Sequence, residues 1–304
     1  MSYQQESLKG VAMVVAASIL WGTTGTAASF APAVSPLAIG AFAMGVSGIL
    51  MVLSSLRGLL KDRAPLRRHY GILLLGSGAV ALYPLAFYSA MRLSGVAVGT
   101  VISIASAPLF AAILEALINR KSVSPLWMFC FVIGVAGIGL ITAGKAPSPG
   151  GGSTVEQYIG AGLGLAAGLT YAVYSWAARR MIEHNIQARS AMASMFGLAA
   201  LGLLPSLALT GDNLFANGTH AGVALYMALI PMYVGYLCFS HGLRSVDASQ
   251  ATLITLLEPV VAVVLAVAVV GERFQAIGWI GATLVVISLL LQLRSSRPVA
   301  RNRG

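Results

Sequence analysis

The chain is a succession of apolar stretches, each about 20 residues long, which is the length of helix that spans the hydrocarbon core of a bilayer. They lie near residues 9–30, 36–56, 70–91, 95–118, 125–144, 157–179, 187–209, 221–242, 247–270 and 275–293. Only 9% of the 304 residues are charged and 58% are hydrophobic, which is too little charge to cover a soluble protein of this size. We therefore predict an all-α integral membrane protein with ten transmembrane helices.

The lysine and arginine residues indicate how these helices are oriented, because basic residues collect in cytoplasmic loops. With the N-terminus in the cytoplasm, 16 of the 19 basic residues fall on the cytoplasmic side. The three exceptions are Arg92, Lys145 and Arg273. We expect both termini to be cytoplasmic. The basic residues occur in short clusters between apolar runs, so the net charge of +10 does not indicate a nucleic-acid partner.

The two halves of the chain resemble each other. Residues Ser89 to Pro108 align without a gap with Ser240 to Pro259. Each half holds five predicted helices, and an odd number forces the second half to insert upside down, as in many secondary transporters. We predict a first five-helix repeat at 1–146, a linker at 147–156, a second, inverted repeat at 157–293 and a basic cytoplasmic tail at 294–304.

Inverted-repeat transporters bind their substrate near the membrane midplane between the repeats, so polar and aromatic side chains deep in the helices are candidate cavity residues. Glu258 is the acidic residue nearest the middle of a predicted helix, where an exposed charge costs about 2.5–3.5 kcal/mol. It is either a proton or substrate-amine site, or a structural group that satisfies carbonyls disturbed by Pro259. Glu115, by contrast, lies close enough to Asn119-Arg120-Lys121 to reach the cytoplasmic interface or pair with these bases.

The remaining candidates for the substrate cavity are aromatic or carry a hydroxyl group: Trp21, Thr24, Tyr83, Phe87, Ser103, Tyr171, Tyr174, Tyr233, Tyr236, Thr252 and Thr255. Serine and threonine in membrane helices also act as packing contacts, which is the alternative role for those in this set. Four prolines are expected to break helices or act in gating: Pro84, Pro108, Pro231 and Pro259. Gly160, Gly164 and Gly168 recur at intervals of four residues and predict a close helix–helix contact.

The sequence contains no phosphate-binding loop, catalytic triad or metal-ligand cluster, and Cys130 and Cys238 lie far apart in apolar runs. We therefore expect no enzyme activity, no catalytic residue, no metal, no cofactor and no ATPase subunit. No Arg or Lys lies deep in a predicted helix, so a strongly anionic substrate would find no counter-charge. The expected partners are the lipid bilayer and a small-molecule substrate. The oligomeric state is left open.

Several short motifs resemble the drug/metabolite transporter superfamily, specifically its ten-helix EamA-type exporters. They are Leu20-Trp21-Gly22, Tyr174-Ser175-Trp176-Ala177 with Arg179-Arg180, and Leu257-Glu258-Pro259 followed by Gly271-Glu272-Arg273. The first half departs from the pattern, with Ala107-Pro108 for Glu-Pro and Arg120-Lys121 where an acidic residue is usual. The resemblance implies a bacterial inner-membrane exporter with a central cavity and alternating access. Within the family, the chain looks most like exporters of aromatic and other apolar amino acids.

We therefore predict a secondary transporter that exports small neutral or zwitterionic metabolites, amino acids and aromatic ones among them. One alternative is a proton-coupled exporter of hydrophobic cationic drugs that uses Glu258. The other is a non-transporting membrane scaffold, and the duplication and short loops argue against it.

Overall fold

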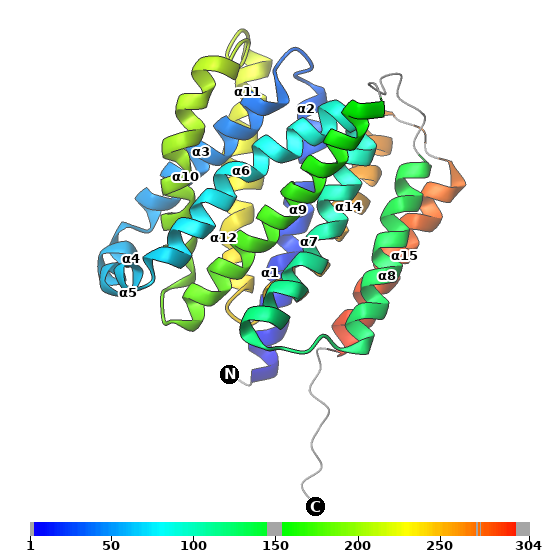
Figure 1. Cartoon of the computed structure of the whole chain (residues 1–304). Coiled ribbons are helices and arrows are strands. Elements are labelled where there is room, and N and C mark those ends of the chain that lie inside the picture. The colour runs from blue at the N-terminus through cyan, green and yellow to red at the C-terminus, as the bar shows by residue number, and fades with distance from the viewer. Residues whose placement is uncertain (1–2, 145–153, 272, 274, 296–304) are drawn as a thin grey trace, which may run out of the picture.

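The computed structural model describes residues 3–144, 154–271, 273 and 275–295, and within these ranges it contains helices and no strand. The helices pack side by side in one bundle (Figure 1), and α1 begins at the same end of the bundle at which α15 ends. We call this the proximal end and the opposite one the distal end. Glu272, most of the predicted linker (147–153) and most of the predicted tail (296–304) lie outside the described residues.

The first half of the chain forms α1 (Tyr3–Gly22), α2 (Thr24–Ser29), α3 (Pro36–Ser54), α4 (Leu56–Lys61), α5 (Arg63–Arg68), α6 (Tyr70–Ser94), α7 (Val96–Asn119) and α8 (Pro125–Ala143). The second half forms α9 (Thr154–Glu183), α10 (Ala188–Thr210), α11 (Gly218–Met227), η1 (Ala228–Val234), α12 (Gly235–Gly242), α13 (Ala248–Ile254), α14 (Leu257–Leu265), η2 (Ala266–Val270) and α15 (Ala276–Ser295). Every range predicted to be helical holds a helix.

Within the described residues, eight helical stretches are long and apolar enough to cross a membrane. The two other long helices are α9, which is 30 residues long but rich in glycine and alanine, and α15, whose apolar stretch is Ala276–Gln292. Lipid offers the backbone no hydrogen-bonding partner, so helices that satisfy their own N–H and C=O groups are the expected solution. The all-helical prediction is confirmed.

Some local features differ from the expectation. Residues 55–69 form the two short helices α4 and α5 in place of a simple loop. Helices α6 and α7 continue through Pro84 and Pro108, so these two prolines do not break their helices. Pro231 lies in the π-helical segment η1, and Pro259 follows a two-residue turn between α13 and α14. A proline is tolerated inside a membrane helix where neighbouring groups compensate for its missing hydrogen bond.

Helix α9 lies against α6 and α7, and its glycines make this contact possible. A methyl group added at Gly160 would approach the backbone nitrogen of Ser94 to 2.6 Å, and one at Gly168 would approach the carbonyl oxygen of Ser103 to 2.7 Å. Gly164 faces Ile102 of α7 in the same way. The close contact predicted from the glycine spacing is therefore confirmed.

We expect Gly168→Ala to destabilise the bundle by about 1–3 kcal/mol, because the added methyl group meets backbone atoms that have no room to move. Gly162, on the same helix, is the matched control, because a methyl group there meets no atom within 4 Å. The measurement is the thermal midpoint of the purified protein in detergent. Equal midpoints for Gly168→Ala and Gly162→Ala would contradict this account of the contact.

Candidate functional site

Two adjoining spaces lie inside the bundle and form what we call the central cavity. The larger has a volume of about 380 Å³ and the smaller about 60 Å³. The residues that line both are Trp21, Thr24, Phe87, Tyr88 and Glu258. The larger space is also lined by Thr100, near the start of α7, and by Val270, the last residue of η2. The central cavity therefore extends from the middle of the bundle toward its distal end.

Most of the predicted cavity residues come together here. Those that line the central cavity are Trp21, Thr24, Tyr83, Phe87, Tyr171, Tyr174, Tyr236 and Glu258, with Pro84 and Pro259 of the predicted prolines. They arrive from α1, α2, α6, α9, α12 and α14, which are far apart in the sequence. The aromatic side chains that lie deep in these helices thus face one interior space, as predicted for tyrosines whose hydroxyl groups need a partner or a wet cavity.

The aromatic rings contact one another around the smaller space. The Tyr171 ring lies 5.2 Å from that of Tyr174 and 5.7 Å from that of Tyr83, measured between centroids. The Trp21 ring lies 4.8 Å from that of Tyr236, and its indole N–H donates a 2.9 Å hydrogen bond to the carbonyl oxygen of Pro231. The rings are therefore held in place by the protein and form a largely preformed wall.

Other predicted candidates lie away from the cavity. Ser103 is buried and donates to the carbonyl oxygen of Gly99 in its own helix, and Thr252 does the same to that of Ala248. Thr255 is also buried, but it accepts a 3.1 Å hydrogen bond from the Tyr171 hydroxyl. Tyr233 packs against the hydrophobic core. Pro108 and Pro231 are likewise absent from the cavity lining. For Ser103 and Thr252 the structure favours the packing role.

Tyr88 lines both spaces and was not predicted. Tyr83 and Phe87 stand four residues apart and share a helix face, which places Tyr88 on a different one. The ring reaches the cavity because Gly40 of α3 has no side chain, and a methyl group there would overlap the Tyr88 ring. Only the packing of α3 against α6 reveals this contact.

Among the described residues that line the central cavity, Glu258 is the charged one, and its side chain is half-buried. Its backbone N–H donates a 3.0 Å bond to the carbonyl oxygen of Thr255, the oxygen that Pro259 leaves without its usual partner. The structural role considered for the Glu258 carboxylate is therefore already filled by its own backbone. Within the described residues, this carboxylate accepts no hydrogen bond and forms no ion pair.

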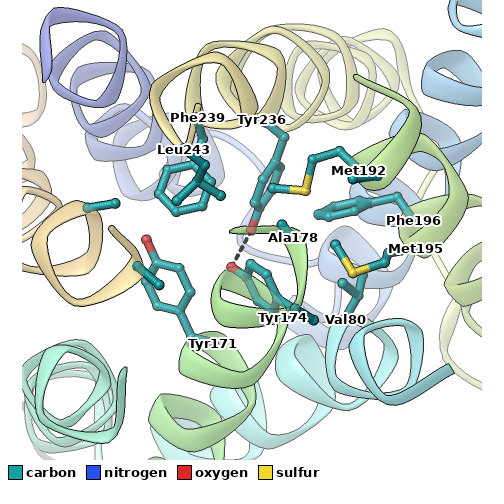
Figure 2. Close-up of a cluster of buried hydrophobic side chains, with 14 of the residues drawn as sticks. Val80, Tyr171, Tyr174, Ala178, Met192, Met195, Phe196, Tyr236, Phe239 and Leu243 are labelled. Carbon is teal, nitrogen blue, oxygen red and sulfur yellow. Dashed lines mark hydrogen bonds between the residues drawn. The ribbon is translucent and has the colours of Figure 1, made fainter. Parts of the chain in front are cut away.

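The cavity is closed on its proximal side by packed aromatic and methionine side chains. Figure 2 shows Tyr174 and Tyr236 pointing toward each other, and their hydroxyl oxygens are 2.9 Å apart. The Phe196 ring lies 4.4 Å from that of Tyr236, between Met192 and Met195. These side chains are buried, so they leave no open path from the cavity to the proximal end along this line.

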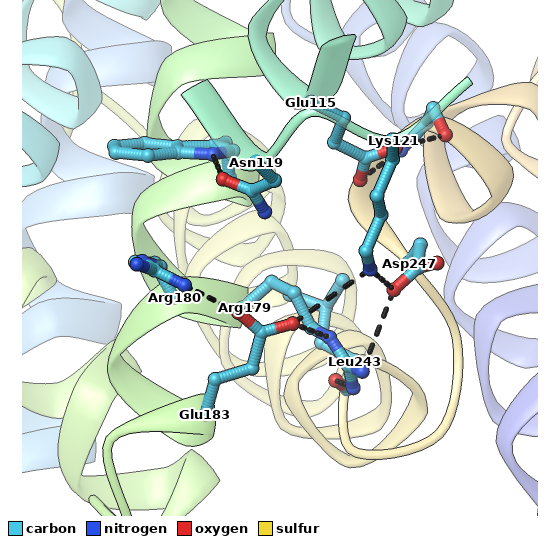
Figure 3. Close-up of polar contacts among 10 residues, drawn as sticks. Glu115, Asn119, Lys121, Arg179, Arg180, Glu183, Leu243 and Asp247 are labelled. Carbon is cyan, nitrogen blue, oxygen red and sulfur yellow. Dashed lines mark hydrogen bonds and ion pairs between the residues drawn. The ribbon is translucent and has the colours of Figure 1, made fainter. Parts of the chain in front are cut away.

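A cluster of charged residues lies below this layer, at the proximal end (Figure 3). It links α9 to the segments that follow α7 and precede α13. Asp247 Oδ1 lies 2.8 Å from Lys121 Nζ and 3.4 Å from Arg179 Nη2. Arg179 also pairs with Glu183 at 3.2 Å and donates a 2.7 Å hydrogen bond to the carbonyl oxygen of Leu243. We call Lys121, Arg179, Glu183 and Asp247 the proximal ionic cluster.

Two further carboxylates join the halves of the chain at the proximal end. Glu115 of α7 accepts hydrogen bonds from the backbone N–H, at 3.1 Å, and the hydroxyl of Ser249 in the first turn of α13. Asp62 accepts a 3.0 Å bond from the N–H of Gln187, the N-cap residue of α10. A carboxylate at a helix N-terminus is stabilised by unpaired N–H groups and the helix dipole. Glu115 thus binds a helix start, whereas the sequence had suggested the interface or the neighbouring bases as its partner.

Comparisons with known proteins agree with this arrangement. The EamA-like transporter family matches the chain twice, at residues 8–143 and 158–294. An uncharacterized transporter of Bacillus subtilis, YwfM, is 30% identical over 279 residues, which cover 91% of each chain. An uncharacterized inner membrane transporter of Salmonella typhimurium, YicL, is 22% identical over 303 residues, covering 96% of this chain and 98% of that one.

The fold has also been seen in a crystal structure. A chain there superposes with a TM-score of 0.78, covering 95% of this chain and 99% of the other at 20% sequence identity. At this identity the likeness concerns the fold.

The proximal ionic cluster gives a test of how this end is held closed. Asp247→Asn removes one of the two acids that pair with both Lys121 and Arg179, and Glu183 is the other. We expect the substitution to lower the free energy of unfolding by about 1 kcal/mol at low salt. Because the residues are partly exposed, the difference from the wild type should shrink in high salt. The measurement is the thermal midpoint in detergent across a salt series.

Asp212→Asn is the control, because Asp212 is an exposed acid near the distal end, outside this cluster. An Asp247→Asn midpoint that matches the Asp212→Asn midpoint at every salt concentration would show that the cluster does not hold the end closed.

Proposed function

The chain belongs to the EamA-like transporter family, and from this premise we propose that it is a secondary transporter that works by alternating access through the central cavity. The observation that carries the proposal is the asymmetry of the cavity. It extends from the middle of the bundle toward the distal end, whereas aromatic packing and the proximal ionic cluster close the other end. A carrier alternates between two such states, and a non-transporting scaffold has no need of a cavity closed at one end.

We further propose that the ten long helical segments all cross the membrane as two inverted five-helix repeats. The repeats are residues 1–146 and 157–293, and the double match to one family supports this division. An inverted pair places its substrate site where the repeats meet. Helices α6 and α7 from the first half and α12 and α14 from the second contribute side chains to the central cavity.

We propose that the proximal end faces the cytoplasm and the membrane is a bacterial inner membrane. Lys121, Arg179, Arg180 and the basic residues of α4 and α5 all lie at the proximal end, and basic residues favour the cytoplasmic side. The relative in Salmonella typhimurium is an inner membrane transporter. In this orientation the structure is the outward-facing state.

The aromatic wall supports a substrate with an apolar or aromatic body, and the predicted substrates are small neutral or zwitterionic metabolites such as amino acids. The larger space of the central cavity, about 380 Å³, lies within the range of sites for small organic ligands. Export, as implied by the family resemblance, requires that the same cavity open toward the proximal end.

A second candidate is proton-coupled export of hydrophobic cations, and Glu258 specifically favours it. A carboxylate without a fixed partner in the cavity can take up a proton on one side and release it on the other. If this is the mechanism, Glu258→Gln abolishes uptake driven by a proton gradient, whereas exchange of labelled for unlabelled substrate continues.

Counterflow in proteoliposomes tests the proposal. We expect saturable accumulation of a labelled substrate from a panel of tryptophan, phenylalanine, threonine and a cationic dye. Tyr171→Ala should reduce it severalfold, because Tyr171 contributes its ring to the wall and a hydrogen bond to Thr255. Tyr171→Phe keeps the ring and should retain more activity.

Tyr158→Ala is the matched control on the same helix, because Tyr158 is 75% exposed and lies outside the cavity. No accumulation of any member of the panel, or an equal loss in Tyr158→Ala and Tyr171→Ala, would count against transport through this cavity.

A further inference from the structure

The ionisable groups that line the central cavity are of one sign, and that sign is negative. Among the described residues, those that line it include one carboxylate, Glu258, and no lysine, arginine or histidine. A carboxylate in a water-poor site favours a cation beside it, because attraction between opposite charges strengthens as the dielectric constant falls. Binding of an anionic ligand group would be unfavourable, because the group would lose its hydration and gain no positively charged partner.

The aromatic rings around Glu258 add to the same preference. Trp21, Phe87 and Tyr88 line the cavity together with it, and the face of an aromatic ring attracts a cation. The combination of one acid with several rings is suited to an ammonium group attached to an apolar body.

The hydrogen-bond donors of the wall also argue against a bound carboxylate. The Trp21 N–H donates to Pro231, and the Tyr171 hydroxyl donates to Thr255. The hydroxyls of Tyr174 and Tyr236 are bonded to each other. The Trp21 and Tyr171 donors are therefore used within the protein, and the Tyr174–Tyr236 pair uses one of its two hydroxyl protons in their mutual bond. A tyrosine hydroxyl elsewhere in the wall accepts as well as donates, so it serves an ammonium group equally well.

We propose that the central cavity is a binding site for small protonated amines with an apolar or aromatic body, held by Glu258, and that it disfavours the same body carrying a carboxylate. This inference rests on the proposed transport function and, of its two candidate substrate classes, selects organic monocations over zwitterions. Glu258 is the residue that determines this specificity.

A matched series of three ligands tests the proposal: 2-phenylethylamine, phenylalanine and 3-phenylpropionate. All three have a phenyl ring on a short chain. The first carries only an ammonium group, the second carries an ammonium and a carboxylate group, and the third carries only a carboxylate. Binding is measured by calorimetry on the purified wild-type protein in detergent. We expect 2-phenylethylamine to bind about tenfold or more tightly than phenylalanine, and 3-phenylpropionate to bind most weakly.

Glu258→Gln should weaken binding of 2-phenylethylamine by about tenfold or more and remove the preference for it over phenylalanine. Glu258→Asp keeps the charge and should retain the preference. Asp212→Asn, an exposed acid outside the cavity, should bind as the wild type does. If a Glu258 variant fails to fold, the three ligands measured on the wild-type protein still test the proposal.

Counterflow of the same three compounds separates this inference from the proposed function. If phenylalanine binds and exchanges as well as or better than the amine, or if none of the three binds, the inference is overturned. If the amine binds through Glu258 but no compound crosses the membrane, the site stands and the transport function falls.

Discussion

The absence of hydrogen-bonding solvent in the hydrocarbon region is the constraint on which the structure depends, since every polar group there must find a partner within the protein. Most of the hydroxyl groups find this partner within their own helix. Ser18, Ser77 and Ser94 each donate to a carbonyl oxygen one turn earlier in their own helix. Against this background the Glu258 carboxylate is informative, because it has no hydrogen-bond or ion-pair partner in the part of the chain that the structure describes. A group that costs free energy in this position and does no structural work there is best explained by a ligand or a proton.

The same constraint explains why the two ends of the bundle differ. At the proximal end, carboxylates of the first half bind helix starts of the second half, Glu115 at Ser249 and Asp62 at Gln187. These buried bonds and the partly exposed proximal ionic cluster hold the halves together at this end. Toward the distal end the cavity lies between other helices of the two halves, although α6 and α9 still contact each other there at Ser94 and Gly160. An alternating carrier needs contacts that are strong enough to close one end and exchangeable enough to release it.

The sequence predicted the helical architecture well, because a long apolar stretch in a membrane has few ways other than a helix to satisfy its backbone hydrogen bonds. It also predicted most of the aromatic wall, because rings deep in a membrane helix need a special environment. It could not place Tyr88, which depends on the missing side chain of Gly40 in another helix. It left open whether Ser103 and Thr252 face a ligand or pack within the bundle, because a hydroxyl that bonds its own backbone cannot be distinguished by spacing from one that faces a ligand. Asp247 was missed because its partners come from segments that only the fold brings together.

Alternating access through the central cavity is most directly tested by distances between spin labels on the protein in lipid nanodiscs. One pair, at Arg92 and Val269, would span the distal mouth, and the other, at Ile118 and Arg244, would span the proximal end; all four positions are exposed. On addition of a transported substrate, the account predicts a population in which the distal distance is shorter and the proximal distance is longer. If substrate crosses the membrane while both distances stay fixed, or change in the same direction, the account is contradicted.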